Sequence, residues 1–238
     1  MTDLIDKLLV KCSDSAYINT AAFSVLGFNR THRISSDSTG TVCYMSYNDM
    51  EKIAVLTFRG TEPDDIRDIK TDLSIFKTEN RHGIKVHKGF YKAYKSIEDR
   101  VDNMIRALPT DYKLYITGHS LGGALAVLAT MDWCHLRHID RLVTFGQPRL
   151  CGYGIKEELR GVEYRRYVYK ADVVPRVPFI NYWHTGTLYQ IMPNGKVVNS
   201  LSKWKETLLM LKRWVLKYHD HMIERYVGKI RKLTRSFL

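Results

Sequence analysis

The serine at position 120 lies between two glycines in the stretch "YITGHSLGGALA". Residues before it are β-branched and aromatic, which predicts a strand, whereas the run of Ala and Leu after it predicts a helix. Gly118, Ser120 and Gly122 spell G-x-S-x-G at this turn, the context in which the motif presents a nucleophile. N–H groups at the start of the helix would face a developing oxyanion. We therefore predict that Ser120 attacks a carbonyl carbon.

A serine hydroxyl needs a histidine base, and the base needs an acid that orients it. After a G-x-S-x-G turn, the acid and then the histidine follow along the chain. Asp172 fits the acid because it comes directly after the predicted strand "RRYVYK" and precedes "VVPRVP", although a solvated loop aspartate is the alternative. Three histidines follow it: His184, His219 and His221. The residue pattern alone leaves the base open among them.

Hydrophobic spacing predicts the elements that must position these residues. Strands alternating with helices between about residues 110 and 170 favour a mainly parallel sheet, which a leading hairpin makes mixed. At 238 residues and 45% apolar composition, the chain is predicted to form one domain over residues 1–238. The expected helices are 3–11 (with Leu4, Ile5, Leu8 and Leu9 on one face), 90–108, 121–136 and 155–159, and the expected strands are 41–47, 53–58, 113–117, 141–146, 163–170 and a final hairpin within 186–199.

Net charge is +12, from 37 basic and 25 acidic residues. Residues 201–238 hold ten Lys and Arg against three acids, which suggests contact with an anionic surface, phospholipid or nucleic acid. The alternative is that these basic residues only form the solvated face of helices that pack on the core. No known nucleic-acid-binding module accompanies it, so nucleic acid is not expected as a partner. The first residues do not resemble a signal peptide, and no apolar run is long enough to span a membrane. The four cysteines lie far apart without a CxxC pair, which favours free thiols over disulfides.

Taken together, the motifs resemble those of the class 3 lipases, a family that includes fungal triacylglycerol lipases, feruloyl esterases and plant phospholipases A1. The resemblance covers over two thirds of the chain in ordered blocks. These blocks are "VLTFRGT", "DIKTDL", "VHKGFYKAY", "YITGHSLGGALA", "VTFGQPRLC", "YKADVVPRVP" and "DHMIERY". The resemblance implies an α/β-hydrolase fold, with a mixed, mainly parallel central sheet flanked by helices and a nucleophile elbow at Ser120.

The same resemblance implies a role for each matching residue. Ser120 would be the nucleophile, Asp172 the acid and His221 the base, and His219 is the alternative base if the "HDH" alignment slips by two residues. Backbone N–H groups of Thr61 and Leu121 would form the oxyanion hole. His184 falls at a family histidine that is not the base. His87 falls at a family position under the site, where we expect a packed structural histidine.

The implied activity is that of a serine carboxylic-ester hydrolase, which cleaves acyl esters of lipids through an acyl-enzyme and requires no cofactor. Residues 62–76 occupy the family's lid position, but their many charges make small esters and phospholipids as plausible as triacylglycerols. The alternatives are a catalytically silent scaffold that binds lipid or protein, and a phospholipase or acyltransferase on anionic membranes. The basic helical segment 201–238 would provide peripheral membrane contact.

Metal binding is not expected. His135 and His138 share one helix face, but we interpret them as solvated side chains, and the H-x-H pair at 219 and 221 lacks further ligands. Secreted fungal members of the family carry disulfides and signal sequences, whereas this sequence suggests neither. The chain is therefore expected to be intracellular (cytoplasmic) or associated with a virion. The sequence predicts no oligomeric state.

Overall fold

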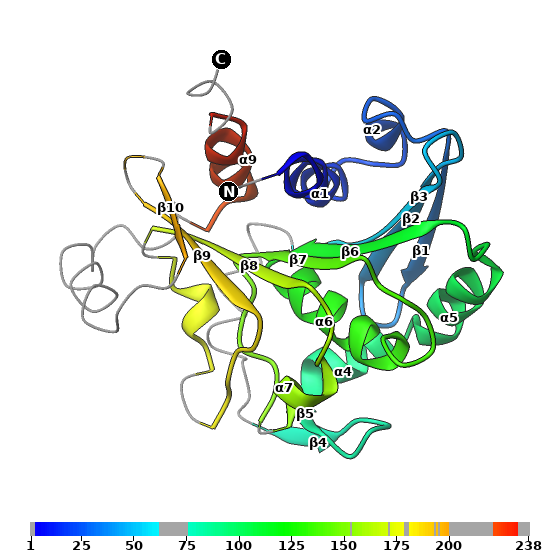
Figure 1. Ribbon diagram of the computed structural model, residues 1–238. Helices are drawn as coiled ribbons and strands as arrows, with labels where there is room; N and C mark the ends of the chain where they lie inside the picture. Colours follow the sequence, from blue (N-terminus) through cyan, green and yellow to red (C-terminus); the bar gives the residue numbers. More distant parts are fainter. Residues whose placement is uncertain are drawn as a thin grey trace.

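A computed structural model of the chain describes residues 3–61, 76–152, 154–170, 172–178, 181–192, 194, 196–199 and 221–232. Its centre is an eight-stranded sheet in the order β1-β2-β3-β6-β7-β8-β9-β10 (Figure 1). The strands are β1 (Arg30–Ser36), β2 (Thr41–Asn48), β3 (Ile53–Phe58), β6 (Lys113–His119), β7 (Arg141–Phe145), β8 (Tyr164–Tyr169), β9 (Thr187–Ile191) and β10 (Val197–Asn199).

The five strands from β3 to β9 pair in parallel, and β1, β2 and β10 pair antiparallel at the two sides of the sheet. The predicted mixed, mainly parallel sheet is therefore confirmed, and so are both predicted hairpins. Because the parallel strands all run in one direction, their carboxyl ends meet at one edge of the sheet, where ligand sites of open α/β sheets lie. Ser120 follows β6 at this edge, and Asp172 lies three residues past the end of β8.

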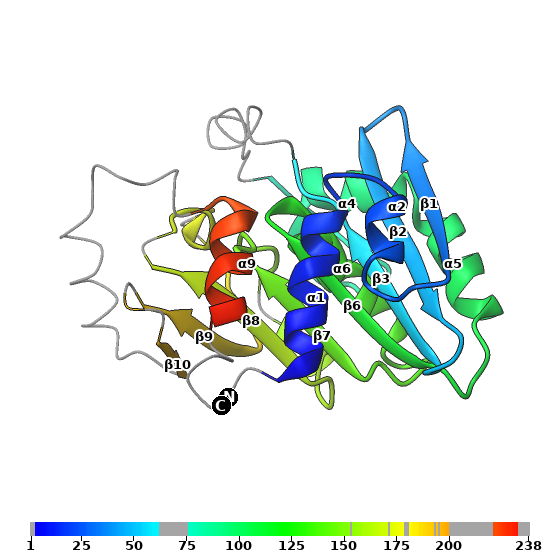
Figure 2. The same ribbon diagram turned by 90° about the horizontal axis from the view of Figure 1, so that it is seen from above.

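Helices cover both faces of the sheet (Figure 1). One face carries α1 (Leu4–Ser15), α2 (Ala21–Ser24) and α9 (Ile223–Lys232); the other carries α4 (Lys88–Lys95), α5 (Glu98–Ala107), α6 (Leu121–Trp133) and α7 (Ile155–Glu158). Figure 2 shows α1 and α9 side by side over the middle of the sheet. Each face has its own cluster of buried side chains, so the sheet is the middle layer of a three-layer fold.

The first helix buries Leu9 and packs Ile5 and Leu8 against the core as predicted, but it differs from its prediction in length and at Leu4. It continues to Ser15, and Leu4 is 79% exposed rather than packed. Asp6 lies at the sheet instead, fully buried between the guanidinium groups of Arg141 and Arg165. The prediction for Leu4 was wrong because these ion pairs, which hydropathy does not reveal, set the rotation of the helix.

The helix predicted over residues 90–108 is two helices, α4 and α5, with a break at Ser96 and Ile97. The Ser96 hydroxyl donates to the Ala93 carbonyl oxygen at 2.7 Å, a local bond that competes with helix continuation. The break also places Glu98, which is 1% exposed, against Lys95 and Arg81. Apolar residues keep their helical spacing across the break, so the sequence pattern does not reveal it.

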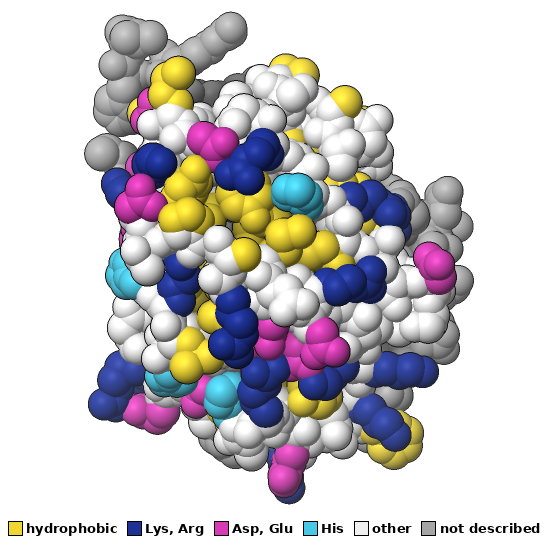
Figure 3. Space-filling view, turned by 90° about the vertical axis from the view of Figure 1, so that its right-hand side faces the viewer, with side chains coloured by type: hydrophobic (Ala, Val, Ile, Leu, Met, Phe, Trp, Pro, Cys, Tyr) yellow, Lys and Arg dark blue, Asp and Glu magenta, His cyan; other side chains and the backbone are white. Residues whose placement is uncertain are grey.

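The sequence patterns did not reveal β1, which forms one edge of the main sheet. All of its residues "RTHRISS" except Ile34 are polar, so the sequence lacks the hydrophobic alternation of a half-buried strand. On this side of the molecule, basic side chains are scattered among acidic and hydrophobic ones (Figure 3). Also unanticipated were α2, the short 3₁₀ turn Val174–Arg176 and the two-stranded sheet of β4 (Lys77–Glu79) and β5 (Lys85–His87).

Candidate active site

Ser120 occupies the sharp turn between β6 and α6 that its motif predicts. Its backbone angles are φ 55° and ψ −129°, in a region that residues with a side chain rarely adopt. Its N–H donates to the Phe145 carbonyl oxygen at 2.9 Å, which ties the turn to β7. Such a conformation costs about 1–3 kcal/mol and persists where the surrounding structure enforces it. The surrounding structure therefore holds Ser120 in this strained conformation.

The two flanking glycines are required by close approach of backbone to backbone. A Cβ at Gly118 would lie 2.4 Å from the backbone of Gly122, and a Cβ at Gly122 would lie 2.2 Å from the Phe58 carbonyl oxygen. Neither distance can be relieved by rotating a side chain. The G-x-S-x-G spacing thus lets β3, the elbow and α6 converge on Ser120.

Ser120, His221 and Asp172 come together in one line of hydrogen bonds. The Ser120 Oγ lies 2.9 Å from His221 Nε2, and His221 Nδ1 lies 2.8 Å from Asp172 Oδ2. All three side chains are at most 1% exposed. The His221 Nδ1–H donates to the carboxylate, which leaves Nε2 free to accept the serine proton. The arrangement is that of a nucleophile, its base and an orienting acid.

Asp172 is held by further hydrogen bonds besides that to His221. Val174 N–H donates to Oδ1 at 3.0 Å, and the Tyr226 hydroxyl donates to Oδ2 at 2.6 Å. Tyr226 comes from α9, and its oxygen also accepts the N–H of Tyr169 at 3.1 Å. Tyr226 ends the "DHMIERY" block, whose resemblance did not predict this contact. The tyrosine thus joins the helix that follows the base to the acid.

Gly146 supplies the space in which the acid and the base meet. It follows β7 with φ +58°, and a Cβ there would lie 3.0 Å from both Asp172 Oδ2 and His221 Cε1. The "VTFGQPRLC" block contains this glycine, but its spacing gave no sign of what it faces. Any larger residue at this position would press on the His221–Asp172 hydrogen bond.

Backbone donors for an oxyanion lie at the start of α6 and at the end of β3. Leu121 is the first residue of α6, and N–H groups in the first turn of a helix have no partner within it. Gly60, directly before Thr61, is so close to the elbow that its Cβ would lie 2.6 Å from the His119 carbonyl oxygen and 3.2 Å from Ser120 Cβ. The structure therefore brings the segment that carries Thr61 against the nucleophile, beside the start of the helix.

The remaining candidate histidines lie apart from this line. His184 Nε2 is 2.6 Å from the Pro175 carbonyl oxygen, and burial lowers the pKa of His184 well below its usual value. His87 caps the start of α4, where its Nδ1 accepts from Phe90 N–H at 3.3 Å and its ring stacks on that of Phe90. His87 is thus a packed structural residue, as predicted. The alternative base His219 lies outside the described residues.

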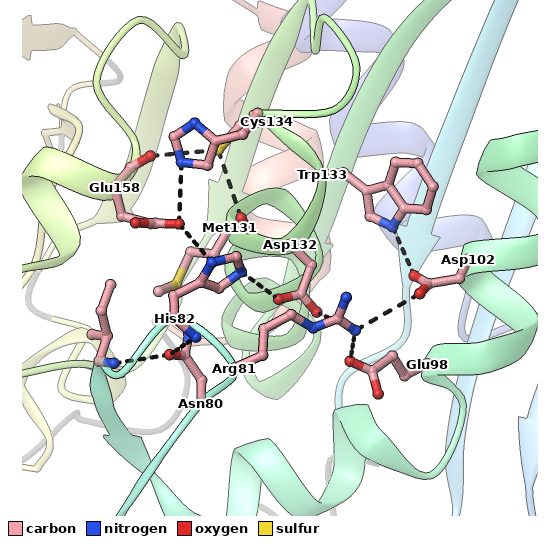
Figure 4. A network of polar contacts seen from close by, with 12 residues as sticks. Asn80, Arg81, His82, Glu98, Asp102, Met131, Asp132, Trp133, Cys134 and Glu158 are labelled. Atoms are coloured by element: carbon pink, nitrogen blue, oxygen red, sulfur yellow. Dashed lines mark hydrogen bonds and ion pairs between the residues drawn. The ribbon is translucent and has the colours of Figure 1, made fainter.

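A second group of polar side chains gathers around the C-terminal end of α6 (Figure 4), whereas Ser120 lies at the start of that helix. Arg81 contacts three carboxylates, those of Glu98, Asp102 and Asp132. His82 Nε2 is 3.0 Å from Asp132 Oδ1, and both His82 and His135 bond to Glu158. His135 was expected to be solvated; it is half exposed and paired with Glu158 at 3.1 Å. Within the described ranges, no set of three His, Cys, Asp or Glu side chains has an arrangement that could hold a metal ion.

Two predicted segments cannot be compared with the structure in full. The lid-like segment 62–76 lies outside the described residues except for Phe76, and of the basic segment 201–238 only residues 221–232 are described. In the described part of the chain, no helix has the length and apolar character needed to cross a membrane.

Comparison with known proteins agrees with this geometry. The profile of the class 3 lipase family matches residues 55–182, and the chain belongs to this family. A lipase from Rhizopus niveus is 37% identical over 158 residues, which cover 60% of this chain and 38% of that protein. The chain thus spans less than two fifths of the length of this curated relative.

Solved structures extend the similarity over most of the chain. The Rhizomucor miehei lipase propeptide complex superposes with a TM-score of 0.77 at 25% identity, covering 91% of this chain and 78% of that one. A triacylglycerol lipase whose catalytic centre is described as a serine protease triad superposes with a TM-score of 0.72 at 25% identity, covering 90% and 89%. The α/β-hydrolase fold predicted from the sequence is therefore confirmed.

Proposed function

We propose that this protein is a serine carboxylic-ester hydrolase that cleaves acyl esters of lipids. The observation that carries the proposal is the unbroken line from Ser120 Oγ through His221 to Asp172, with hydrogen bonds of 2.9 and 2.8 Å. A buried serine with no such partner would be a poor nucleophile, because its hydroxyl would keep its proton. Family membership and the named lipases among its relatives support an ester as the substrate.

Hydrolysis proceeds in two acyl-transfer steps. Ser120 Oγ forms a bond to the ester carbonyl carbon while its proton passes to His221 Nε2, and the carbonyl oxygen becomes an oxyanion. The intermediate collapses as His221 returns that proton to the leaving alcohol, so the acyl group remains on Ser120. Water then loses a proton to His221 and attacks the acyl-enzyme. As the bond between the acyl carbon and Ser120 Oγ breaks, His221 returns that proton to Oγ, which releases the carboxylic acid and restores the serine. Asp172 orients His221 and stabilises its positive charge in both steps.

The oxyanion would be held by the N–H groups of Leu121 and Thr61. Leu121 lies at the positive end of the α6 dipole, which favours negative charge at this point. Loss of one such donor typically removes about 3 kcal/mol of transition-state stabilisation. The close contact between Gly60 and the elbow supports the part assigned to Thr61.

Two measurements on the wild type and a Ser120→Ala variant test the proposal. Wild-type protein should hydrolyse short p-nitrophenyl esters and be labelled at Ser120 by a fluorophosphonate probe, and the variant should do neither while keeping the wild-type circular dichroism spectrum. These measurements also separate an enzyme from a silent lipid- or protein-binding scaffold, which would show no adduct. Undiminished turnover in the Ser120→Ala variant would contradict the serine mechanism.

The substrate class is to be assigned by comparing a mixed lipid extract treated with wild type or with Ser120→Ala. Depletion of triacylglycerols, of phospholipids or of small esters in the wild-type sample alone would identify the class, and new esters would indicate acyl transfer to an alcohol. Peripheral contact with anionic membranes, and the intracellular or virion-associated setting, stay predictions. Binding to vesicles with and without anionic lipid measures the membrane contact directly.

A further inference from the structure

A second chain of hydrogen bonds reaches the base through its backbone rather than through its ring. The Tyr17 hydroxyl lies 2.9 Å from His119 Nδ1, and His119 Nε2 lies 2.7 Å from the backbone carbonyl oxygen of His221. Tyr17 follows the first helix of the chain, and His119 is the residue before the nucleophile. The contacts thus link three segments that are about a hundred residues apart in the sequence.

The Tyr17 hydroxyl also lies against the turn that leads to Thr61. A Cβ at Gly60 would be only 2.1 Å from the tyrosine oxygen, so Gly60 is the residue that lets the hydroxyl reach His119. The same position would bring that Cβ within 2.6 Å of the His119 carbonyl oxygen. One phenol ring therefore touches the elbow and the end of β3 together.

The direction of these hydrogen bonds is fixed by chemistry. A carbonyl oxygen only accepts, so His119 Nε2 must carry the proton that it shares with His221. In a neutral imidazole Nδ1 is then the acceptor, and the Tyr17 hydroxyl is the donor. Burial lowers the pKa of His119 well below its usual value, and neighbouring His221 lowers it further. The chain therefore runs from Tyr17 O–H to His119 Nδ1, and from His119 Nε2–H to the carbonyl oxygen of His221.

We propose that Tyr17 and His119 form a positioning pair that holds the backbone of the catalytic base in register with Ser120. This inference rests on the proposed function. Asp172 holds the His221 ring through Nδ1, but this bond does not fix the backbone that carries the ring. A shift of that backbone would still move Nε2 relative to Ser120. His119 anchors the backbone through the His221 carbonyl oxygen, and the two rings lie 4.7 Å apart between centroids. A neutral His119 also avoids placing a positive charge beside the His221 imidazolium that forms during the reaction.

Substitutions at His119 separate its hydrogen bond from its bulk. Glutamine can place its side-chain amide nitrogen where Nε2 lies, and asparagine places its amide where Nδ1 lies, too short to reach the His221 carbonyl oxygen. We expect His119→Gln to keep kcat within about 3-fold of wild type, whereas His119→Asn and His119→Leu lose about 30–100-fold in kcat with little change in KM, as a small displacement of a catalytic group does. Equal kcat values for His119→Gln and His119→Asn, or wild-type kcat in His119→Leu, would overturn the proposal.

Tyr17 is tested together with His119. Tyr17→Phe should lower kcat about 3–10-fold, in keeping with the loss of one hydrogen bond to the pair. In the His119→Leu background the same change should have no further effect, because the two residues act as a unit. Independent, multiplicative losses would contradict a shared role. Tyr44→Phe is the matched control, since it removes a phenol hydroxyl from β2, which pairs with β1 and β3, and it should keep wild-type kcat.

A spectroscopic measurement does not depend on turnover. Nitrogen-15 NMR of imidazole-labelled protein should show His119 as the neutral Nε2–H tautomer from about pH 5 to pH 8, since its charged form is disfavoured by burial. An Nδ1–H tautomer, or titration of His119 within that range, would refute the assigned contacts. If the tautomer is as expected but wild type hydrolyses no ester, the proposed function fails while the contacts stand. If wild type is active and His119→Leu matches it, the positioning role alone fails.

Discussion

The hydroxyl of Tyr226 and the His221 imidazole bond to the same oxygen of Asp172, at 2.6 and 2.8 Å. Two donors on one carboxylate oxygen fix the rotation of the carboxylate, which in turn orients the imidazole that it accepts from. Tyr226 is fully buried, so water cannot replace its hydroxyl without opening the core.

Tyr226→Phe removes this donor and keeps the ring. We expect kcat to fall about 3–30-fold and the free energy of unfolding to fall by about 1–3 kcal/mol, because a buried acceptor loses a charge-assisted bond. Steady-state kinetics and urea denaturation measure the two effects. Tyr189→Phe on β9 serves as the control for removal of a phenol hydroxyl from the same face of the sheet. An unchanged kcat in Tyr226→Phe would show that Asp172 is held without it.

Gly146→Ala tests the space between the acid and the base. The new methyl group would lie 3.0 Å from Asp172 Oδ2 and His221 Cε1, which is tighter than nine in ten real Cβ contacts, so the His221–Asp172 pair must give way by a few tenths of an ångström. A loss of about 10–100-fold in kcat is expected, because a misplacement of about 1 Å can cost about 100-fold. Gly40→Ala has the matching backbone strain, with φ +64°, but nothing within 4 Å of its Cβ. It should lose stability without losing kcat; equal kcat losses in both variants would attribute the effect to strain alone.

Asp6→Asn tests the anchor of the first helix. Asp6 is fully buried, with Arg165 Nη1 at 2.7 Å and the Tyr167 hydroxyl at 2.6 Å from Oδ2. Removing one partner of a buried ion pair leaves uncompensated charge, so the free energy of unfolding should fall by about 3–5 kcal/mol. Asp3→Asn, at a carboxylate that is 38% exposed and bonds to the same two arginines, should cost at most about 1 kcal/mol. Similar losses from the two variants would contradict the assigned burial of Asp6.

Stability is expected to decline in mildly acidic solution. Burial lowers the pKa of His184 and of His119 well below its usual value, so the unfolded chain binds protons that the folded chain does not. The free energy of unfolding is therefore unaffected by these groups above about pH 6.5, and falls as pH drops below it by up to about 1.4 kcal/mol per pH unit for each histidine. Urea denaturation between pH 5 and pH 8 measures the slope.

His184→Gln isolates one of the two contributions. Its stability should vary less with pH below about 6.5 than that of wild type, because glutamine does not titrate there. His138→Gln, at a side chain that is 82% exposed, controls for loss of a surface imidazole. A slope in His184→Gln as steep as that of wild type would assign the acid sensitivity to other groups.

Much of the fold could be predicted because its signals are local. The elbow follows from the residues around Ser120, and the parallel strands follow from short apolar runs that alternate with helical patterns. The break between α4 and α5 was missed because Ser96 and Ile97 interrupt the backbone without interrupting the hydrophobic spacing. The edge strand β1 was missed because an exposed strand carries little hydrophobic pattern.

The site could be predicted only as far as residue types and motif order reach. The residue pattern left the base open among His184, His219 and His221, and only the family resemblance favoured His221, with His219 as the alternative. The structure brings His221 to Ser120 because α9 packs beside α1 and carries Tyr226 to Asp172. Contacts such as that between Tyr17 and His119 join residues 102 positions apart, and no single-sequence pattern encodes them. The role of Gly146 could not be predicted for the same reason, because the side chains that leave no room for a Cβ there, Asp172 and His221, come from two other segments.

The distance of 101 residues between Ser120 and His221 also sets the order in which the site can appear during translation. At typical rates of about 5–20 residues per second, the serine leaves the ribosome several seconds before the histidine that deprotonates it. Until α9 docks beside α1, the nascent chain carries a nucleophile with no base. The proposed ester cleavage therefore has to wait until α9, the last of the described helices to be synthesised, has been made.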